Sequence, residues 1–229
     1  MSILSHQPLY QPLLLSVLLF ISGGAQEMPK EKGDFREPEL VELAKLDQTI
    51  KLDIRYATSN NFLGRPVYKE SRAFLQRPAA DALIRANRKL REKGYGLLVF
   101  DGYRPWSVTK IFWDSTPRDK KQFVANPSQG SRHNRGCAVD LTLYELRSGK
   151  EVEMPSGYDE MTDHAYPNYS GGTPERRRMR EMLREAMESE GFTVYEFEWW
   201  HFDYKDWKRY SILDIGFDQI KPAPVRMRH

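Results

Sequence analysis

The chain has 229 residues, and its 35 basic and 32 acidic side chains give a formal net charge of +3. The two signs are interspersed along the chain, which argues against a nucleic-acid partner. A hydrophobic fraction of 40% and an aromatic fraction of 12% exclude a disordered chain. The length favours one domain, and the single cysteine, Cys137, excludes an intrachain disulfide.

The N-terminal segment has the composition of an export signal. Residues 1–25 contain no Lys, Arg, Asp or Glu, and residues 13–21 (LLLSVLLFI) form an almost wholly apolar run. This run is too short for a bilayer, which needs about 20 residues. Small residues up to Ala25 then provide a cleavage site. We expect a cleaved signal over 1–25, a periplasmic or secreted protein, and no membrane span after cleavage; an apolar leader or a retained anchor is the alternative.

The rest of the chain divides into three parts. Residues 26–40 are charged and contain Pro and Gly, which predicts a linker. The folded domain is expected over 41–211. The stretch over 212–229 ends with basic residues and is expected to be a C-terminal extension of unknown role.

Within the domain, helical and strand-like segments mix without regular alternation. Apolar patterning and composition predict strands over residues 50–56, 96–100, 138–143 and 192–202. Apolar spacing, Pro at the start and Gly at the end predict helices over residues 78–93, 105–115 and 174–190. This mixture favours the α+β class, with a single domain in which helices pack on a mainly antiparallel sheet.

Two histidines and an aspartate stand out as metal-ligand candidates. His133 lies in a polar turn, and Asp140 opens an apolar strand, where an ionised carboxylate needs a partner charge or a metal. His201 follows Glu198 among large apolar side chains. Two imidazoles and one carboxylate suit Zn²⁺ and leave a fourth position for water. Locally, however, Asp140 could also cap the loop or pair with an arginine, and His201 could be a core histidine.

Five segments, in this order, resemble the motifs of the D-alanyl-D-alanine dipeptidases, a family of zinc D,D-peptidases. They are residues 56–58 (YAT), 101–105 (DGYRP), 131–140 (SRHNRGCAVD), 157–161 (GYDEM) and 198–201 (EWWH). The resemblance spans about residues 50 to 210. The chain departs from the family's pattern at Asp163-His164, where the family usually has an adjacent His pair, and His164 is expected to be a loop residue.

The resemblance implies one Zn²⁺ per chain, held by His133, Asp140 and His201. It implies that Glu198 is the catalytic base, which takes a proton from water and passes it to the leaving amine. It also implies that Arg104 stabilises the oxyanion of the transition state. On a regular strand Glu198 and His201 would point to opposite faces, so we predict an irregularity within residues 198–201.

The resemblance further implies that Tyr56, Ser131 and Asp159 bind a small dipeptide, D-Ala-D-Ala. The carboxylate of Asp159 is expected to pair with the ammonium group of the substrate, and Ser131 is expected to bind its carboxylate. Two other functions stay open from the sequence. One is a D,D-carboxypeptidase that acts on longer cell-wall peptides, and the other is a non-catalytic, zinc-stabilised wall-binding module.

Overall fold

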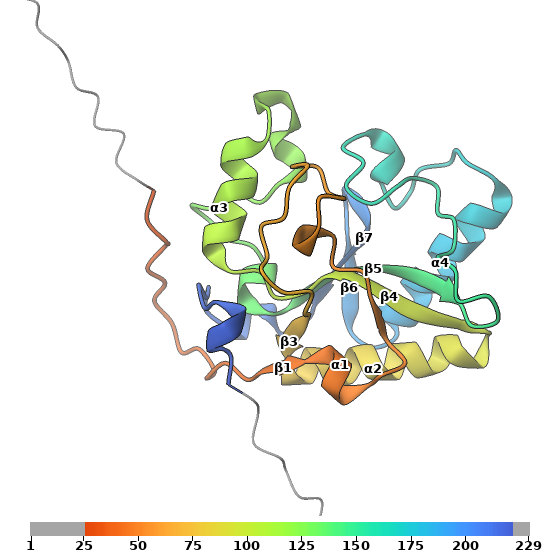
Figure 1. The fold of residues 1–229 in the computed structure, drawn as a ribbon, viewed down its shortest axis with the longest axis horizontal. Helices are drawn as coiled ribbons and strands as arrows, with labels where there is room; N and C mark the ends of the chain where they lie inside the picture. Colours follow the sequence, from red (N-terminus) through yellow and green to blue (C-terminus); the bar gives the residue numbers. More distant parts are fainter. Residues whose placement is uncertain (1–25, 222–229) are drawn as a thin grey trace, which may run out of the picture.

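The computed structural model describes residues 26–221, and a five-stranded sheet forms their centre (Figure 1). The expected signal over 1–25 and residues 222–229 lie outside the described part of the chain. The strands, in spatial order, are β2 (Lys51–Leu52), β4 (Tyr95–Asp101), β5 (Ala138–Glu145), β7 (Glu198–Tyr204) and β6 (Phe192–Tyr195). β2 pairs with β4 in parallel, and every other pairing in this sheet is antiparallel. The predicted α+β class with a mainly antiparallel sheet is confirmed.

Helices and short turns surround this sheet. The α-helices are α1 (Leu43–Leu46), α2 (Arg77–Glu92), α3 (Trp106–Ser115) and α4 (Pro174–Glu188). A second, two-stranded sheet pairs β1 (Leu40–Glu42) with β3 (Phe74–Gln76). Short 3-10 helices cover Arg55–Ala57, Arg118–Phe123, His133–Arg135, Asp163–Ala165, Trp207–Arg209 and Phe217–Gln219. Figure 1 shows α2 along one side of the sheet and α3 on the other.

The ends of α4 follow from its sequence. The side chain of Thr173 accepts a hydrogen bond from the backbone N–H of Arg176 (3.2 Å), which satisfies one of the free donors at the helix start. Pro174 occupies the first helical turn, where its missing N–H costs nothing. Beyond the other end, Gly191 adopts a positive φ of 89°, which turns the chain into β6.

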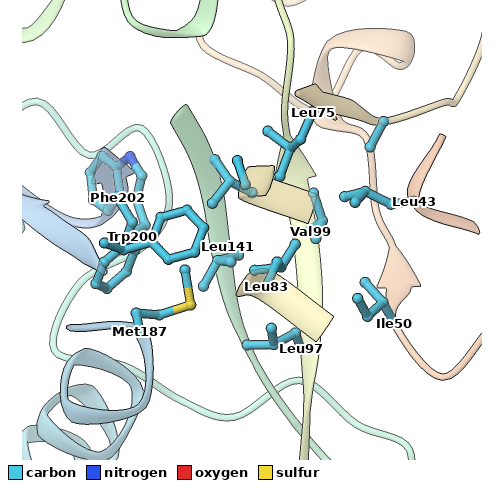
Figure 2. Packing of buried hydrophobic residues seen from close by; sticks show 14 of the residues in the cluster. Leu43, Ile50, Leu75, Leu83, Leu97, Val99, Leu141, Met187, Trp200 and Phe202 are labelled. Carbon is cyan, nitrogen blue, oxygen red and sulfur yellow. The ribbon is translucent and has the colours of Figure 1, made fainter. Parts of the chain in front are cut away.

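The main core lies between the sheet and the helices α2 and α4. Figure 2 shows Leu83 of α2 and Met187 of α4 packed against Val99 of β4, Leu141 of β5 and Phe202 of β7. All five side chains are fully buried. The methionine-containing face of α4 therefore lines the core, as the helical spacing predicts.

The opposite face of the sheet carries the polar residues. Asp140 lies between two core residues of β5, so strand alternation turns its side chain away from α2 and α4. Asp140 is the register partner of Asp101 on β4 and of His201 on β7. A register shift between Val99 and Asp101 changes the face to which Asp101 points. Three polar side chains thus form one row across three adjacent strands.

Two predicted strands differ from the observed elements. In the segment 50–56 only Lys51 and Leu52 pair with β4, and a 3-10 helix begins at Arg55. Ile54 and Tyr56 are buried all the same, so the alternating pattern correctly reflects burial but not strand pairing. The segment 192–202 is a hairpin of β6 and β7 rather than one strand. Its turn at residues 196–197 lacks the Gly, Asn or Pro that would have indicated it.

The segments on either side of the predicted domain also contact it. Residues 26–39, which the sequence predicts as a linker, have no regular secondary structure, but Glu31 pairs with the buried guanidinium of Arg135. Glu31 also accepts a hydrogen bond from the backbone N–H of Ile212 (2.7 Å). Ile212 and Phe217, in the predicted extension, are buried. Across residues 26–221, none of the helices has both the length and the apolar character needed to cross a membrane.

Candidate metal centre and active-site cavity

His133, Asp140 and His201 meet at one buried point. Oδ1 of Asp140 lies 3.2 Å from Nε2 of His133 and 3.0 Å from Nδ1 of His201. The two histidine nitrogens are 3.1 Å apart. Bonds of 2.0–2.1 Å to a tetrahedral zinc ion would place neighbouring ligand atoms about 3.3 Å apart. The three atoms therefore have nearly the mutual separation of zinc ligands.

In each histidine, the outer ring nitrogen, which faces away from Asp140, makes a hydrogen bond to another residue. The inner nitrogen, which faces Asp140, is then the candidate metal ligand. Nδ1 of His133 lies 2.7 Å from the carbonyl oxygen of Gly102, to which it donates. Nε2 of His201 donates to the carboxylate of Asp203 (2.9 Å). With a metal bound, each ring would be neutral and have one N–H, so the nitrogens that face Asp140 would offer lone pairs. Oδ1 of Asp140 is buried next to these two nitrogens. Two imidazole nitrogens and a carboxylate oxygen that converge on one point fit a bound cation, and the N₂O donor set suits Zn²⁺.

The loop before β5 fixes the position of His133. The hydroxyl of Ser131 accepts a hydrogen bond from the N–H of His133 (3.2 Å), and the side chain of Asn134 accepts one from the N–H of Ser131 (2.7 Å). Gly136 then turns the chain with a φ of 66°. A Cβ atom there would lie 2.5 Å from Cδ2 of Leu40. The positive φ favours glycine at this position, and a larger residue would also have to displace the end of the Leu40 side chain.

Glu198 reaches the same point through an irregular strand pairing. Val194 of β6 pairs with Phe202, but the next residue, Tyr195, pairs with Glu198. The extra residues on β7 let two side chains three positions apart point into one site, and the predicted irregularity is confirmed. Oε2 of Glu198 lies 3.8 Å from Nδ1 of His201. Burial raises the pKa of Glu198 to about 8. The charge of His201 lowers this pKa in part, and the charge of Asp140 raises it.

Arg104 is held beside the metal ligands by Asp101. The Nε and Nη2 atoms of Arg104 bond to Oδ2 of Asp101 at 2.9 and 2.8 Å. Burial lowers the pKa of the guanidinium, but Asp101, Tyr56, Tyr68 and Asp140 together outweigh this effect and raise that pKa above its ordinary value. Nη2 also lies 3.5 Å from Oδ2 of Asp140. A fixed positive charge therefore stands next to the candidate metal position.

Tyr56 and Asp159 form a second polar pair. The hydroxyl of Tyr56 lies 2.9 and 3.1 Å from the two carboxylate oxygens of Asp159. Asp159 has a positive φ of 58°, which is rare for a residue other than glycine and often marks a binding site. Burial, and then the charge of Asp140, raise the pKa of Asp159 to about 7. This carboxylate lacks a cationic partner among the described residues that it contacts.

All eight residues selected from the sequence line a single cavity of about 490 Å³. Aromatic side chains form much of the remaining wall, including Phe62, Phe112, Trp113, Tyr195 and Trp207. A concave pocket in which aromatic side chains surround convergent polar groups is a usual form of a small-molecule site. The cavity brings together His133, Asp140, His201, Glu198, Arg104, Tyr56, Ser131 and Asp159.

The sequence reasoning missed three residues that support this site. Asp101 anchors Arg104 and could have been found as the first residue of the DGYRP segment. Asp203 binds His201, and its position two residues later on the strand places both side chains on one face. Tyr158 bonds to Asp140 (3.0 Å), and nothing in the sequence indicated that contact.

Two side chains that could have competed for a role lie outside this cavity. Cys137 is fully buried, and burial raises the pKa of its thiol, as expected for a small core residue. His164 is exposed, as expected for a loop residue, and lies in the short 3-10 helix Asp163–Ala165, where it bonds to Glu160 (3.0 Å). Among residues 26–221, the group of potential metal-binding side chains that the structure brings together is His133, Asp140 and His201.

The α+β fold, the buried histidine–aspartate set and the neighbouring glutamate and arginine define a metal-dependent hydrolase. Residues 36–215 match the family of peptidase M15, described as D-ala-D-ala dipeptidase. The chain therefore belongs to the D-Ala-D-Ala dipeptidase family and is a metallopeptidase of that family.

Two named relatives from sequence comparison agree with this family. The D-alanyl-D-alanine dipeptidase of Escherichia coli is 31% identical over 179 residues, which cover 78% of this chain and 91% of the relative. The D-alanyl-D-alanine dipeptidase of Enterococcus faecalis is 37% identical over 171 residues, which cover 67% and 85%. The solved structure of the vancomycin resistance D,D-dipeptidase VanXYg has 19% identity and a TM-score of 0.39, with 74% of this chain and 67% of that chain covered.

Proposed function

We propose that this protein hydrolyses free D-Ala-D-Ala to two molecules of D-alanine with one Zn²⁺ per chain. The observation that carries the proposal is the presence of two complementary subsites in one cavity. The His133, Asp140 and His201 set fits a metal, and Asp159 offers a carboxylate to an ammonium group. A free dipeptide presents both a scissile amide and such an ammonium group.

Zinc held by this set supplies a Lewis acid that polarises the scissile carbonyl and lowers the pKa of water. Glu198 accepts the proton of the attacking water and returns it to the leaving amine. Its raised pKa, about 8, suits a group that exchanges a proton near neutral pH. Arg104, fixed by Asp101, donates hydrogen bonds to the oxyanion that forms. Loss of one such donor typically lowers kcat by about 10²–10³.

The ammonium subsite, formed by Asp159 and Tyr56, sets the length of the substrate. Asp159, positioned by the hydroxyl of Tyr56, pairs with the free ammonium group of the dipeptide. An N-acylated peptide has no charge at this position and would leave the buried carboxylate without a partner, which is costly. Ser131 lines the same cavity and donates its hydroxyl to the carboxylate of the substrate.

The test compares D-Ala-D-Ala with N-acetyl-D-Ala-D-Ala, using the purified chain with and without zinc. The expected result is zinc-dependent hydrolysis of the free dipeptide and a kcat/KM lower by at least about 10² for the acetylated one. Equal rates would favour a D,D-carboxypeptidase that acts on longer wall peptides. Zinc binding with no hydrolysis of either compound would favour a wall-binding module.

We also propose that the protein acts outside the cytoplasm. The apolar run over residues 13–21 and the small residues that follow support this location. The test is cell fractionation with N-terminal sequencing of the mature chain. An N-terminus near residue 26 in the exported fraction is expected, and an uncleaved chain in the cytosol would contradict the proposal.

A further inference from the structure

Tyr158 lies behind the wall of the active-site cavity and contacts both of its subsites. Its hydroxyl oxygen is 3.0 Å from Oδ2 of Asp140 and 3.2 Å from the hydroxyl oxygen of Tyr56. Tyr56 in turn bonds to Asp159. A continuous chain of polar contacts therefore joins the metal ligand Asp140 to the ammonium-binding carboxylate of Asp159, and Tyr158 is its central link.

Ring packing holds the Tyr158 hydroxyl in place. The centroid of the ring lies 4.6 Å from that of Phe100 and 5.5 Å from that of Trp200. The centroid of the Tyr56 ring lies 6.1 Å from that of the Tyr158 ring. Aromatic contacts at these separations restrain the ring independently of the hydroxyl. The position of the hydroxyl is thus a property of the packed core and not of the hydrogen bond alone.

The number of available protons shows which group is the donor in the hydrogen bond between Tyr158 and Asp140. A phenol has an ordinary pKa near 10, so each hydroxyl keeps its one proton at neutral pH. The proton of Tyr56 lies between two oxygens of the Asp159 carboxylate, and the proton of Tyr158 goes to the carboxylate of Asp140. Oδ2 of Asp140 is then occupied, and only Oδ1 faces the two histidines.

Arg104 is the other donor near the same oxygen. Its Nη2 atom lies 3.5 Å from Oδ2 of Asp140, beyond the distance of a normal hydrogen bond. Without the Tyr158 hydroxyl, this oxygen would be buried next to a guanidinium and would draw it closer. The hydroxyl therefore leaves Arg104 free to serve the reaction.

We propose that Tyr158 is a positioning residue that keeps Asp140 a single-oxygen metal ligand and links that ligand to the ammonium subsite. When an ammonium group pairs with Asp159, the Tyr56 proton can turn toward the Tyr158 oxygen and strengthen the donation of Tyr158 to Asp140. The metal half of this proposal stands on the geometry of the described residues alone. The substrate half rests on the proposed dipeptidase function.

The first experiment measures the zinc affinity of the full chain with Tyr158→Phe, by competition with a chromogenic chelator. Loss of an outer hydrogen bond to a ligand typically weakens metal binding about 10–100-fold, and a loss in this range is expected. Tyr144→Phe is the control because Tyr144 is a buried tyrosine whose hydroxyl donates only to the backbone oxygen of Thr49, away from the site. Its zinc affinity is expected to equal that of the wild type.

The second measurement uses Co²⁺ in place of zinc and records the visible absorption spectrum, which reports ligand geometry. Tyr158→Phe is expected to change the spectrum, because Asp140 can then present both oxygens, while Tyr144→Phe is not. Unchanged zinc affinity and an unchanged spectrum in Tyr158→Phe would overturn the proposal. So would failure of Tyr158→Phe to fold where Tyr144→Phe folds, because the hydroxyl would then be a requirement of the fold.

The substrate half is tested with the Tyr56→Phe and Tyr158→Phe variants and their combination at saturating zinc. The two changes are expected to be non-additive in kcat/KM for D-Ala-D-Ala, as contacting residues of one network are. Additive effects would remove the link between the subsites. A chain that binds zinc in a Tyr158-dependent manner but does not hydrolyse D-Ala-D-Ala would overturn only the proposed function.

Discussion

Asp203 and His201 lie two residues apart on β7, and the carboxylate of Asp203 accepts a hydrogen bond of 2.9 Å from the outer nitrogen of His201. Asp203 is itself paired with Arg132 (3.3 Å). The bond fixes both the orientation of the imidazole and the nitrogen that carries its proton. It therefore points the inner nitrogen toward the candidate metal position.

Asp203→Asn is expected to weaken zinc binding by about 10-fold or more, because an amide is a poorer acceptor and lacks the charge of the carboxylate. Asp206→Asn is the control, since Asp206 pairs with Arg36 at the surface, outside the cavity. Dialysis against a graded zinc buffer, followed by metal analysis, measures both affinities. Equal affinities would show that the imidazole is oriented by other contacts.

Glu198→Ala is expected to retain zinc and to lose turnover by about 10²–10⁴-fold, the range for removal of a general base. Glu198 approaches His201 but is not one of the three converging ligand atoms. Glu196→Ala, in the exposed turn two residues earlier, is expected to leave kcat unchanged. Metal analysis and hydrolysis of D-Ala-D-Ala are measured on the same samples. Loss of zinc from Glu198→Ala would instead make Glu198 part of the metal site.

The stability of the metal-free chain should depend on pH through Asp159. Its pKa rises from 3.8 to about 7 on folding, so its contribution is fully present below pH 4 and is lost as pH rises through about 7. Asp159→Asn keeps the side-chain shape and tolerates the positive φ but cannot ionise. The variant is expected to lose less stability than the wild type between pH 5 and pH 8, by an amount on the order of 1–3 kcal/mol.

Urea unfolding of the metal-free proteins at these two pH values measures the difference. Asp119→Asn, at an exposed position of the 3-10 helix Arg118–Phe123, is the control. The same pH dependence in the wild type and Asp159→Asn would show that another group causes it. Bound zinc is expected to reduce this pH dependence, because its positive charge offsets the negative charge of Asp140, which raises the pKa of Asp159.

Gly136→Ala is expected to destabilise the fold by more than Gly64→Ala. Both glycines have a similar positive φ, 66° and 65°, so both substitutions incur a backbone cost of about 1–2 kcal/mol. A Cβ atom at Gly136 would also meet Leu40 at 2.5 Å, whereas one at Gly64 would meet no atom within 4 Å. Denaturant unfolding compares the two variants with the wild type. Equal losses would mean that the Leu40 side chain can move aside without cost.

The sequence alone predicted the residues of the site better than the strands that hold them. His133, Asp140 and His201 were identifiable because the segments that carry them resemble the motifs of a known family, whereas the local sequence alone left other roles open for Asp140 and His201. The β6–β7 hairpin was not, because its turn at residues 196–197 carries no residue typical of turns. Burial patterns likewise could not show that the chain leaves the sheet after Leu52.

Contacts behind the cavity wall were the least predictable. Tyr158 and Asp140 are joined only because residues 147–172, a stretch with little regular structure, fold back over β5. No periodicity describes such a stretch, so neither its path nor the direction of its side chains can be read from the sequence. Asp203 was accessible in principle, since strand geometry places it beside His201.

The pairing of Glu31 with Arg135 has a practical consequence for recombinant work. Arg135 immediately precedes Gly136 in the loop that carries His133, and its buried guanidinium is neutralised by a residue far upstream in the chain. Cutting the gene at the first strand, Leu40, would leave that cation without its counter-charge and loosen the loop that holds a zinc ligand. Expression should therefore begin no later than residue 26, and low metal content in shorter versions would reflect the truncation and not the native enzyme.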